Sequence, residues 1–219
     1  MKKILFLIAS LVFIVQSGYA DSPLTSTEFY QAYLDVPIVK AAADNPNVLT
    51  EEMMDYLYDY ANPLDVKMAL INAVGWNVDG RLSTFPDYLI YCAEHFDRER
   101  YGVGDKMLTS EDLFLYATPD QMAVFVYLRA LADYSNVTYL YSSAGYAMQR
   151  PVNKQSFMLP MALVWAQVQL EVGRWEGIYP SVERLFLDAE IKDMRPEAVN
   201  MIMDYINLYK KYADSEDEQ

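Results

Sequence analysis

Apolar residues recur at intervals of three and four over most of the chain, and this spacing is the period of an amphipathic helix. The clearest case follows Pro196, where Ala198, Ile202 and Tyr205 share one helical face and Asp204 lies on the opposite face. Segments with the strict alternation of a half-buried strand are hard to find. The pattern therefore predicts an all-α protein.

Helix-start signals divide the chain into separate helices. Thr118 and Gln121 have the spacing of a capping box, in which each side chain accepts a hydrogen bond from the other residue's backbone N–H group. Pro119 suits the first helical position, because proline has no N–H group to leave unpaired. Thr25 and Glu28 show the same capping-box spacing. Helices are expected at residues 25–34, 36–43, 50–60, 63–76, 85–96, 110–117, 119–135, 138–148, 157–172, 180–190 and 196–213.

Two segments, 49–63 and 108–119, repeat one order of signals. Each contains Leu-Thr, an acidic pair, an aromatic helix, an alanine, a capping residue and a proline, and each leads into a longer apolar helix. A weaker third case leads into Pro196, at an unequal distance along the chain. This recurrence predicts packed helical hairpins, arranged either as a short irregular helical-repeat (solenoid-like) array or as a compact irregular bundle.

The N-terminus has the three parts of a secretory signal peptide. Lys2 and Lys3 precede an apolar run over 4–15, and Gly18 and Ala20 provide a small-x-small ending. We expect cleavage after Ala20 and export of the protein, to a periplasmic or secreted location. A retained membrane anchor is the weaker alternative, because the run is shorter than the ~20 residues that span a bilayer.

Removal of the signal peptide, residues 1–20, would leave one all-α domain over 21–213 and a disordered acidic tail over 214–219. No transmembrane segment is expected in this mature chain. The full sequence has 17 basic and 31 acidic residues, a net charge of −14. Such acidity opposes binding to nucleic acid, which requires clustered Lys and Arg, so no nucleic-acid partner is expected.

Cys92 and His95 are the only cysteine and the only histidine in the sequence. They are three residues apart, so both can project from one face of the helix expected at 85–96. Zinc takes three or four ligands from Cys, His and carboxylate side chains, and every further ligand would have to be a carboxylate. A packed cysteine and a helix-end histidine fit better, and we expect no metal, no cofactor and no catalytic residue.

The segment GWNVDGR, which starts at Gly75, has alternating polar residues before a glycine, as a calcium-binding EF-hand loop does. The first and twelfth positions, which an EF-hand fills with acidic residues, are Gly75 and Pro86. The favoured interpretation is therefore a core tryptophan followed by a polar turn. The functional alternative is a loop in which Trp76, Asp79 and Arg81 contact a ligand.

Residues suited to catalysis are few, whereas aromatic residues are abundant, with 19 Tyr, 9 Phe and 3 Trp. The sequence thus favours a non-catalytic protein-protein interaction or scaffold module, with catalysis left as the less favoured option. The alternative is a carbohydrate-binding or carbohydrate-active protein that uses exposed aromatics and carboxylates. Aromatic rings lining one groove beside two close carboxylates would favour that alternative, and rings buried between helices would oppose it.

Overall fold

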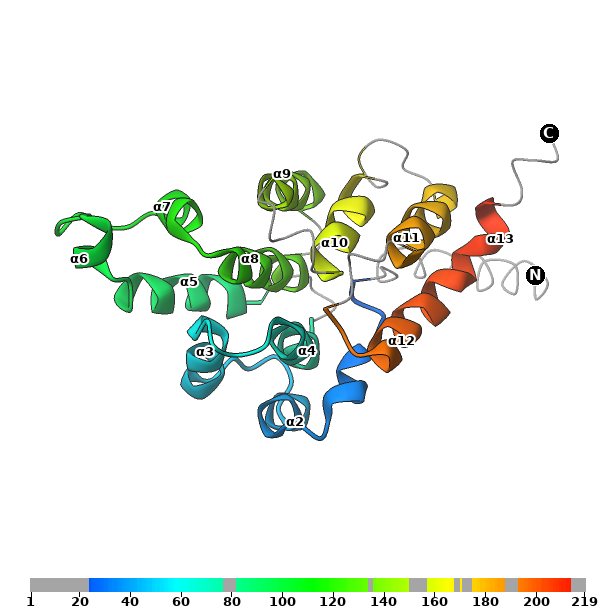
Figure 1. Cartoon of the computed structure of the whole chain (residues 1–219), viewed down its shortest axis with the longest axis horizontal. Helices are drawn as coiled ribbons and strands as arrows, with labels where there is room; N and C mark the ends of the chain where they lie inside the picture. The colour runs from blue at the N-terminus through cyan, green and yellow to red at the C-terminus, as the bar shows by residue number, and fades with distance from the viewer. Residues whose placement is uncertain are drawn as a thin grey trace, which may run out of the picture.

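All secondary structure in the described part of the chain is helical, which confirms the predicted all-α class (Figure 1). The predicted signal peptide and the predicted acidic tail lie outside this part, and so do Asp79 and Arg81. The computed structural model describes residues 24–76, 82–133, 136–149, 157–167, 170, 175–187 and 193–213.

Each helix predicted from the sequence has a counterpart, usually within a few residues of the expected ends. The 3₁₀ helices are labelled η. In chain order the elements are η1 (Phe29–Tyr33), α2 (Pro37–Asp44), α3 (Glu51–Tyr58), α4 (Leu64–Val74), α5 (Thr84–Glu94), α6 (Arg98–Tyr101), α7 (Ser110–Tyr116), α8 (Pro119–Ala132), α9 (Val137–Met148), α10 (Met158–Gln167), η4 (Trp175–Gly177), α11 (Ile178–Leu187), α12 (Pro196–Ile206), η5 (Asn207–Tyr209) and α13 (Lys210–Ala213).

Two helices, α4 and α8, form the centre of the core and pack against each other. Every residue of α4 from Val66 onward is buried, and so is every residue of α8 from Met122 onward except Arg129. A helix that is apolar on all sides belongs in the interior of a protein. Four helices flank this pair, α9 and α10 on one side and α2 and α3 on the other (Figure 1).

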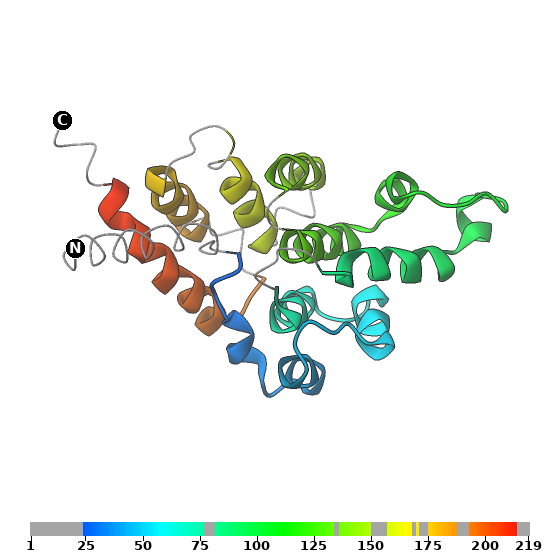
Figure 2. The same ribbon diagram turned by 180° about the vertical axis from the view of Figure 1, so that it is seen from behind.

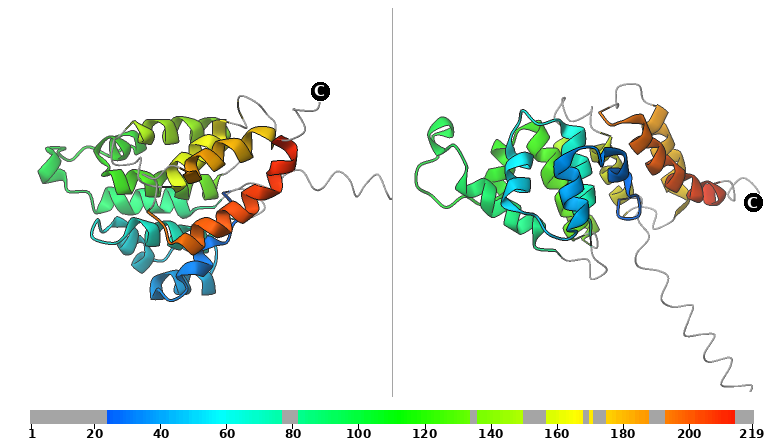
Figure 3. Two further views of the ribbon diagram at one scale, coloured as in Figure 1. Left: turned by 45° about the vertical axis from the view of Figure 1, so that its right-hand side comes forward. Right: turned by 90° about the horizontal axis from the view of Figure 1, so that it is seen from below.

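The two ends of the described chain meet, because η1 packs against α12 (Figure 2). At one end of the molecule α5, α6 and α7 extend away from the core, and α11 to α13 form the opposite end (Figure 3). Among the described residues, no helix has both the length and the apolar composition that crossing a bilayer requires.

The predicted capping box of α8 is present. The Gln121 N–H donates to Thr118 Oγ1, and the Thr118 N–H donates to Gln121 Oε1, both at 3.2 Å. The corresponding prediction for Thr25 and Glu28 is wrong, because η1 begins only at Phe29 and no side chain caps it. The residues before η1 instead bind α4 and the residues that follow it.

Candidate functional site

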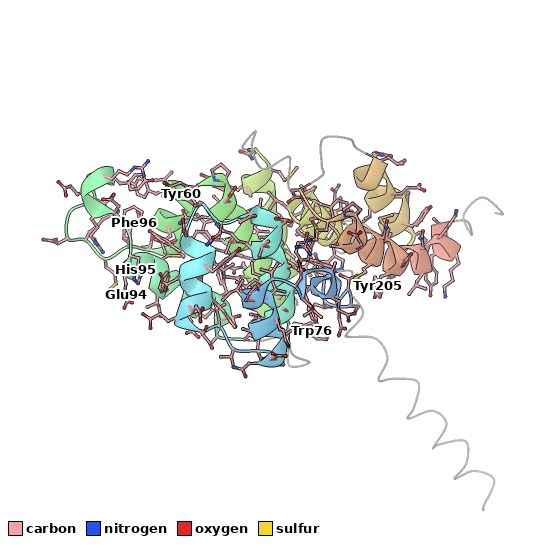
Figure 4. All side chains as sticks on the ribbon, turned by 60° about the horizontal axis from the view of Figure 1, so that its bottom comes forward. Tyr60, Trp76, Glu94, His95, Phe96 and Tyr205 are labelled. Carbon is pink, nitrogen blue, oxygen red and sulfur yellow. The ribbon has the colours of Figure 1, made fainter. Side chains whose placement is uncertain are left out.

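Trp76 is the one member of the predicted ligand-contact set within the described residues. Its ring is half-buried, and its Nε1–H donates to the Thr25 carbonyl oxygen at 2.8 Å. It lines a cavity of about 260 Å³ together with Asn72 and Glu28. In Figure 4 Trp76 lies away from the labelled residues of the α5–α7 end. The visible role of Trp76 is thus to hold the segment before η1, and ligand contact by Trp76, Asp79 and Arg81 stays a prediction.

A second, more aromatic pocket lies at the α5–α8 end of the molecule and has a volume of about 270 Å³. Its lining comes from the end of α3 and the loop after it, from α5, α6 and α7, and from the start of α8. Polar groups at the same pocket include His95, Asp97, Arg100 and Gln121. Six aromatic rings line it: Tyr58, Tyr60, Phe96, Tyr101, Tyr116 and Phe125.

Three of these rings form a cluster between α5, α6 and α7. The ring centroids of Phe96 and Tyr101 are 5.1 Å apart, those of Phe96 and Tyr116 are 5.5 Å apart, and those of Tyr101 and Tyr116 are 5.1 Å apart. Aromatic pairs at such distances stabilise a structure beyond the area they bury. The cluster therefore holds three segments together and shapes one wall of the pocket.

The helix α6 brings two of the lining residues, Arg100 and Tyr101, to the pocket, and the sequence patterns did not predict it. Asp97 caps this helix by accepting the Arg100 N–H at 2.9 Å. Gly102 ends it with a φ of 63°, a left-handed conformation that glycine adopts at little cost. One turn of helix bounded by an aspartate and a glycine is too short to produce a hydrophobic period, which explains the omission.

The loop that follows α6 is fixed by polar contacts. Arg98 Nη1 donates to the carbonyl oxygens of Gly104 at 2.9 Å and Lys106 at 2.7 Å. Lys106 Nζ lies 2.8 Å from Asp112 Oδ1, and its hydrogen bond lowers the pKa of the Asp112 carboxyl to about 2. The aspartate also completes a capping box with Thr109 at the start of α7. These contacts hold the loop between α6 and α7, the two helices that supply Arg100, Tyr101 and Tyr116 to the pocket.

Cys92 and His95 both line the pocket, as their spacing on one helical face suggested. The His95 Nδ1 lies 2.9 Å from the Tyr91 carbonyl oxygen, and because a carbonyl oxygen only accepts, Nδ1 donates this hydrogen bond. The Cys92 side chain is 2% exposed, and burial raises the pKa of its thiol to about 12. Such a thiol is almost entirely protonated at neutral pH and is a poor nucleophile.

The pocket lacks, within the described residues, the pair of carboxylates that glycoside hydrolysis requires. Asp97 is the one carboxylate that lines it within the described residues, whereas glycoside hydrolysis uses two acids about 5–10 Å apart. Three acids, Glu52, Asp55 and Asp59, line a separate open groove between α2 and α3. In the described part of the chain, no three His, Cys, Asp or Glu side chains converge as metal ligands would.

The sequence pointed to the cysteine and histidine of this pocket but not to its rings. The aromatic residues come from five separate segments, and in the sequence each resembles an ordinary packing residue of its own segment. Tyr60 is the exception, because it lies in the connection between α3 and α4 and is 81% exposed, but that exposure is visible only in the structure. No protein-family model matches the chain, and neither the curated proteins nor the solved structures that were compared give a match.

Proposed function

We propose that the chain is an exported, non-catalytic protein-interaction module and that the aromatic pocket at the α5–α8 end receives an apolar side chain of a partner protein. The observation that carries this proposal is a cavity of about 270 Å³ with six aromatic rings in its lining. Pockets for drug-sized ligands have about 300–1,000 Å³, so this one suits a single anchoring group. The anchors of protein interfaces are typically aromatic or apolar side chains buried in such pockets.

The exposure of Tyr60 supports a partner that covers the pocket. Its ring lines the cavity and is 81% exposed, so a bound partner would remove most of a tyrosine from water. Burial of that ring contributes on the order of 2–4 kcal/mol before ordering costs are subtracted. Other apolar side chains on the same end, Ile90, Met107 and Leu115, are 58%, 90% and 57% exposed and offer further apolar area.

The chemistry of the lining favours binding over catalysis. The thiol is protonated at neutral pH, a single carboxylate is present within the described lining, and the histidine Nδ1 is occupied by a backbone carbonyl. Export through the predicted signal peptide and a stacked, irregular repeat arrangement of the hairpins remain parts of the proposal. Both would suit an interaction protein, because helical hairpins expose continuous surfaces to partners.

Carbohydrate binding is the second candidate, and one observation favours it. Planar polar side chains, those of Asp97, Arg100 and Gln121, lie at the pocket beside the rings. Sugars present hydroxyl groups that such side chains bind and C–H faces that stack on aromatic rings. The presence of one carboxylate directs this candidate to sugar binding and away from sugar hydrolysis.

Selection from a displayed library of random peptides tests the proposal, with the full chain as target. We expect the selected peptides to share an apolar residue and to lose about tenfold or more in affinity for Tyr60→Ala, which removes a mostly exposed ring without opening the core. Tyr212→Ala, at the opposite end and 41% exposed, is the matched control and should bind within about twofold of the unmodified chain.

Two results would contradict the protein-interaction proposal. One is a set of selected peptides that bind the unmodified chain and the Tyr60→Ala variant equally. The other is the failure of repeated rounds to enrich any peptide, together with saturation-transfer NMR signals from a panel of methyl glycosides that vanish in the Tyr60→Ala variant. The second result would establish the carbohydrate candidate in its place.

A further inference from the structure

The basic side chains near the aromatic pocket differ in how they are used. Between residues 84 and 118 the chain has three, Arg98, Arg100 and Lys106. Arg98 binds two carbonyl oxygens of the loop after α6, and Lys106 pairs with Asp112. Both therefore hold the loop between α6 and α7, and neither lines the cavity.

Arg100 is the exception. Its side chain lines the pocket and is exposed, and its guanidinium makes no hydrogen bond and no ion pair within the described ranges. The guanidinium carbon lies 5.4 Å from the centroid of the Tyr101 ring, which belongs to the aromatic cluster of the pocket. The backbone of Arg100 is fixed by the N–H bond to Asp97. A cation is thus held at the edge of an apolar cavity with its donors unused.

A guanidinium presents its donors as a planar fork that matches the two oxygens of a carboxylate. We infer that the pocket binds an apolar side chain with a carboxylate next to it, the chemistry of a hydrophobic residue at the C-terminus of a partner protein. This inference rests on the proposed function, because the apolar group occupies the same cavity. The ring cluster holds the side chain, and Arg100 binds the carboxylate.

The net charge of −14 opposes an anionic ligand, so distance decides which effect dominates. At physiological ionic strength the screening length is about 8 Å, so acidic groups beyond that distance have little effect on a carboxylate bound at Arg100. Asp97 is the one carboxylate in the described lining, and its Oδ1 already accepts the Arg100 N–H. A carboxylate in direct contact with Arg100 therefore gains more from that contact than it loses to the distant charges.

A partner protein can present an apolar side chain next to a carboxylate in two ways. One is a free C-terminus, and the other is an Asp or Glu that follows an apolar residue. Three probes separate them: N-acetylphenylalanine, its amide, and the dipeptide amide N-acetylphenylalanyl-aspartate amide. Each is titrated into the full chain, and binding is followed by backbone NMR shifts at Tyr101 and Tyr116. The affinity of the plain amide measures binding to the apolar cavity alone. The affinities of the two probes with a carboxylate show how much that group adds.

We expect N-acetylphenylalanine to bind about tenfold more tightly than its amide, and we expect the preference to weaken as salt is added. In Arg100→Gln the acid and the amide should bind alike, and Arg100→Lys should restore part of the preference. Arg184→Gln, an exposed arginine of α11, is the matched control and should keep the preference in full.

The failures of the two proposals are distinguishable. If the acid and the amide bind equally at the pocket, the carboxylate inference is overturned while the interaction pocket stands. If the dipeptide amide alone exceeds the plain amide, the ligand is an internal acidic segment and the C-terminal assignment is overturned. If no probe shifts the pocket resonances at millimolar concentration, the pocket is not an anchor site and both proposals are overturned.

Discussion

Lys67 places an ammonium group in the first turn of the central helix α4. Its side chain is 0% exposed, and its Nζ has no hydrogen-bond partner among the described residues. Burial lowers the pKa of this lysine, and the charges of Asp120 and Asp59 oppose the shift without forming an ion pair within the described ranges. A buried cation without a partner destabilises the folded state, because its lost hydration is not replaced.

We therefore expect Lys67→Met to raise the free energy of unfolding at pH 7 by about 1–3 kcal/mol. The sign of the pH dependence follows from the lowered pKa: the unfolded chain binds more protons, so the penalty in the unmodified chain is relieved as pH rises toward about 10.4. The advantage of the variant should shrink over the same range. Urea unfolding of both chains at several pH values measures this difference.

The control for Lys67→Met is Lys40→Met. Lys40 is a mostly exposed lysine of α2, paired with Asp44 at 2.9 Å, so its replacement should change the free energy of unfolding by less than about 1 kcal/mol. A Lys67→Met variant that is less stable than the unmodified chain would contradict the prediction. That result would mean that the ammonium group has a compensating partner.

The N-terminus of α7 shows how one helix depends on the charge of a single carboxylate. Asp112 accepts hydrogen bonds from Lys106 and from the Thr109 backbone and side chain, and the contact with Lys106 contributes most to its lowered pKa. The carboxylate form is therefore favoured in the folded state. Its contribution to stability is present above the unfolded pKa near 3.9 and is lost as pH falls through the folded value of about 2.

We expect amide protection in α7 to fall between about pH 4 and about pH 2, measured by hydrogen exchange and NMR. In Asp112→Asn this acid-dependent step should be absent, and protection should already be low at pH 5. The amides of α8, whose capping box uses the uncharged Gln121, provide the internal reference. Superimposable α7 profiles for the unmodified chain and Asp112→Asn would show that the carboxylate does not hold this helix.

Whether the sequence predicts a helix start depends on whether its contacts are local or come from residues distant in the chain. The capping box at Thr118 is local, so four consecutive residues suffice to identify it. The same spacing fails at Thr25 because distant residues compete: the Trp76 indole binds the Thr25 carbonyl oxygen, and Asn72 binds the Thr27 carbonyl oxygen at 2.9 Å and the Tyr30 N–H at 3.0 Å. A helix starting at Thr25 would break these hydrogen bonds to Trp76 and Asn72.

The candidate site illustrates the same limit. Cys92 and His95 meet at the pocket because one turn of a helix joins them, and their spacing predicts this. The rings of Tyr58, Tyr101 and Tyr116 line the same pocket although they come from α3, α6 and α7, and no spacing in the sequence encodes that arrangement. Helix periodicity thus predicts the elements of this protein, whereas its pocket depends on contacts between elements.

At the scale of the whole molecule, Arg195 joins the end of the described chain to its beginning. Its guanidinium binds both oxygens of Asp35, at 2.6 and 3.1 Å, donates to the Ala32 carbonyl oxygen at 2.7 Å and lies 4.4 Å from the centroid of the Tyr33 ring. Its backbone N–H donates to the Tyr33 hydroxyl at 2.8 Å. These contacts fix the start of α12 against η1 and the turn that follows it.

Arg195→Ala should lower the free energy of unfolding by about 1–2 kcal/mol, a range that reflects the partial exposure of the ion pair. Arg195→Lys should recover little of this loss, because an ammonium group cannot bind both Asp35 oxygens and the Ala32 carbonyl oxygen at once. Hydrogen exchange should show η1 and α12 losing protection together, since each covers the other. If α12 opens while η1 keeps its protection, the two ends fold independently, and the packed hairpins behave as separable units joined in a row.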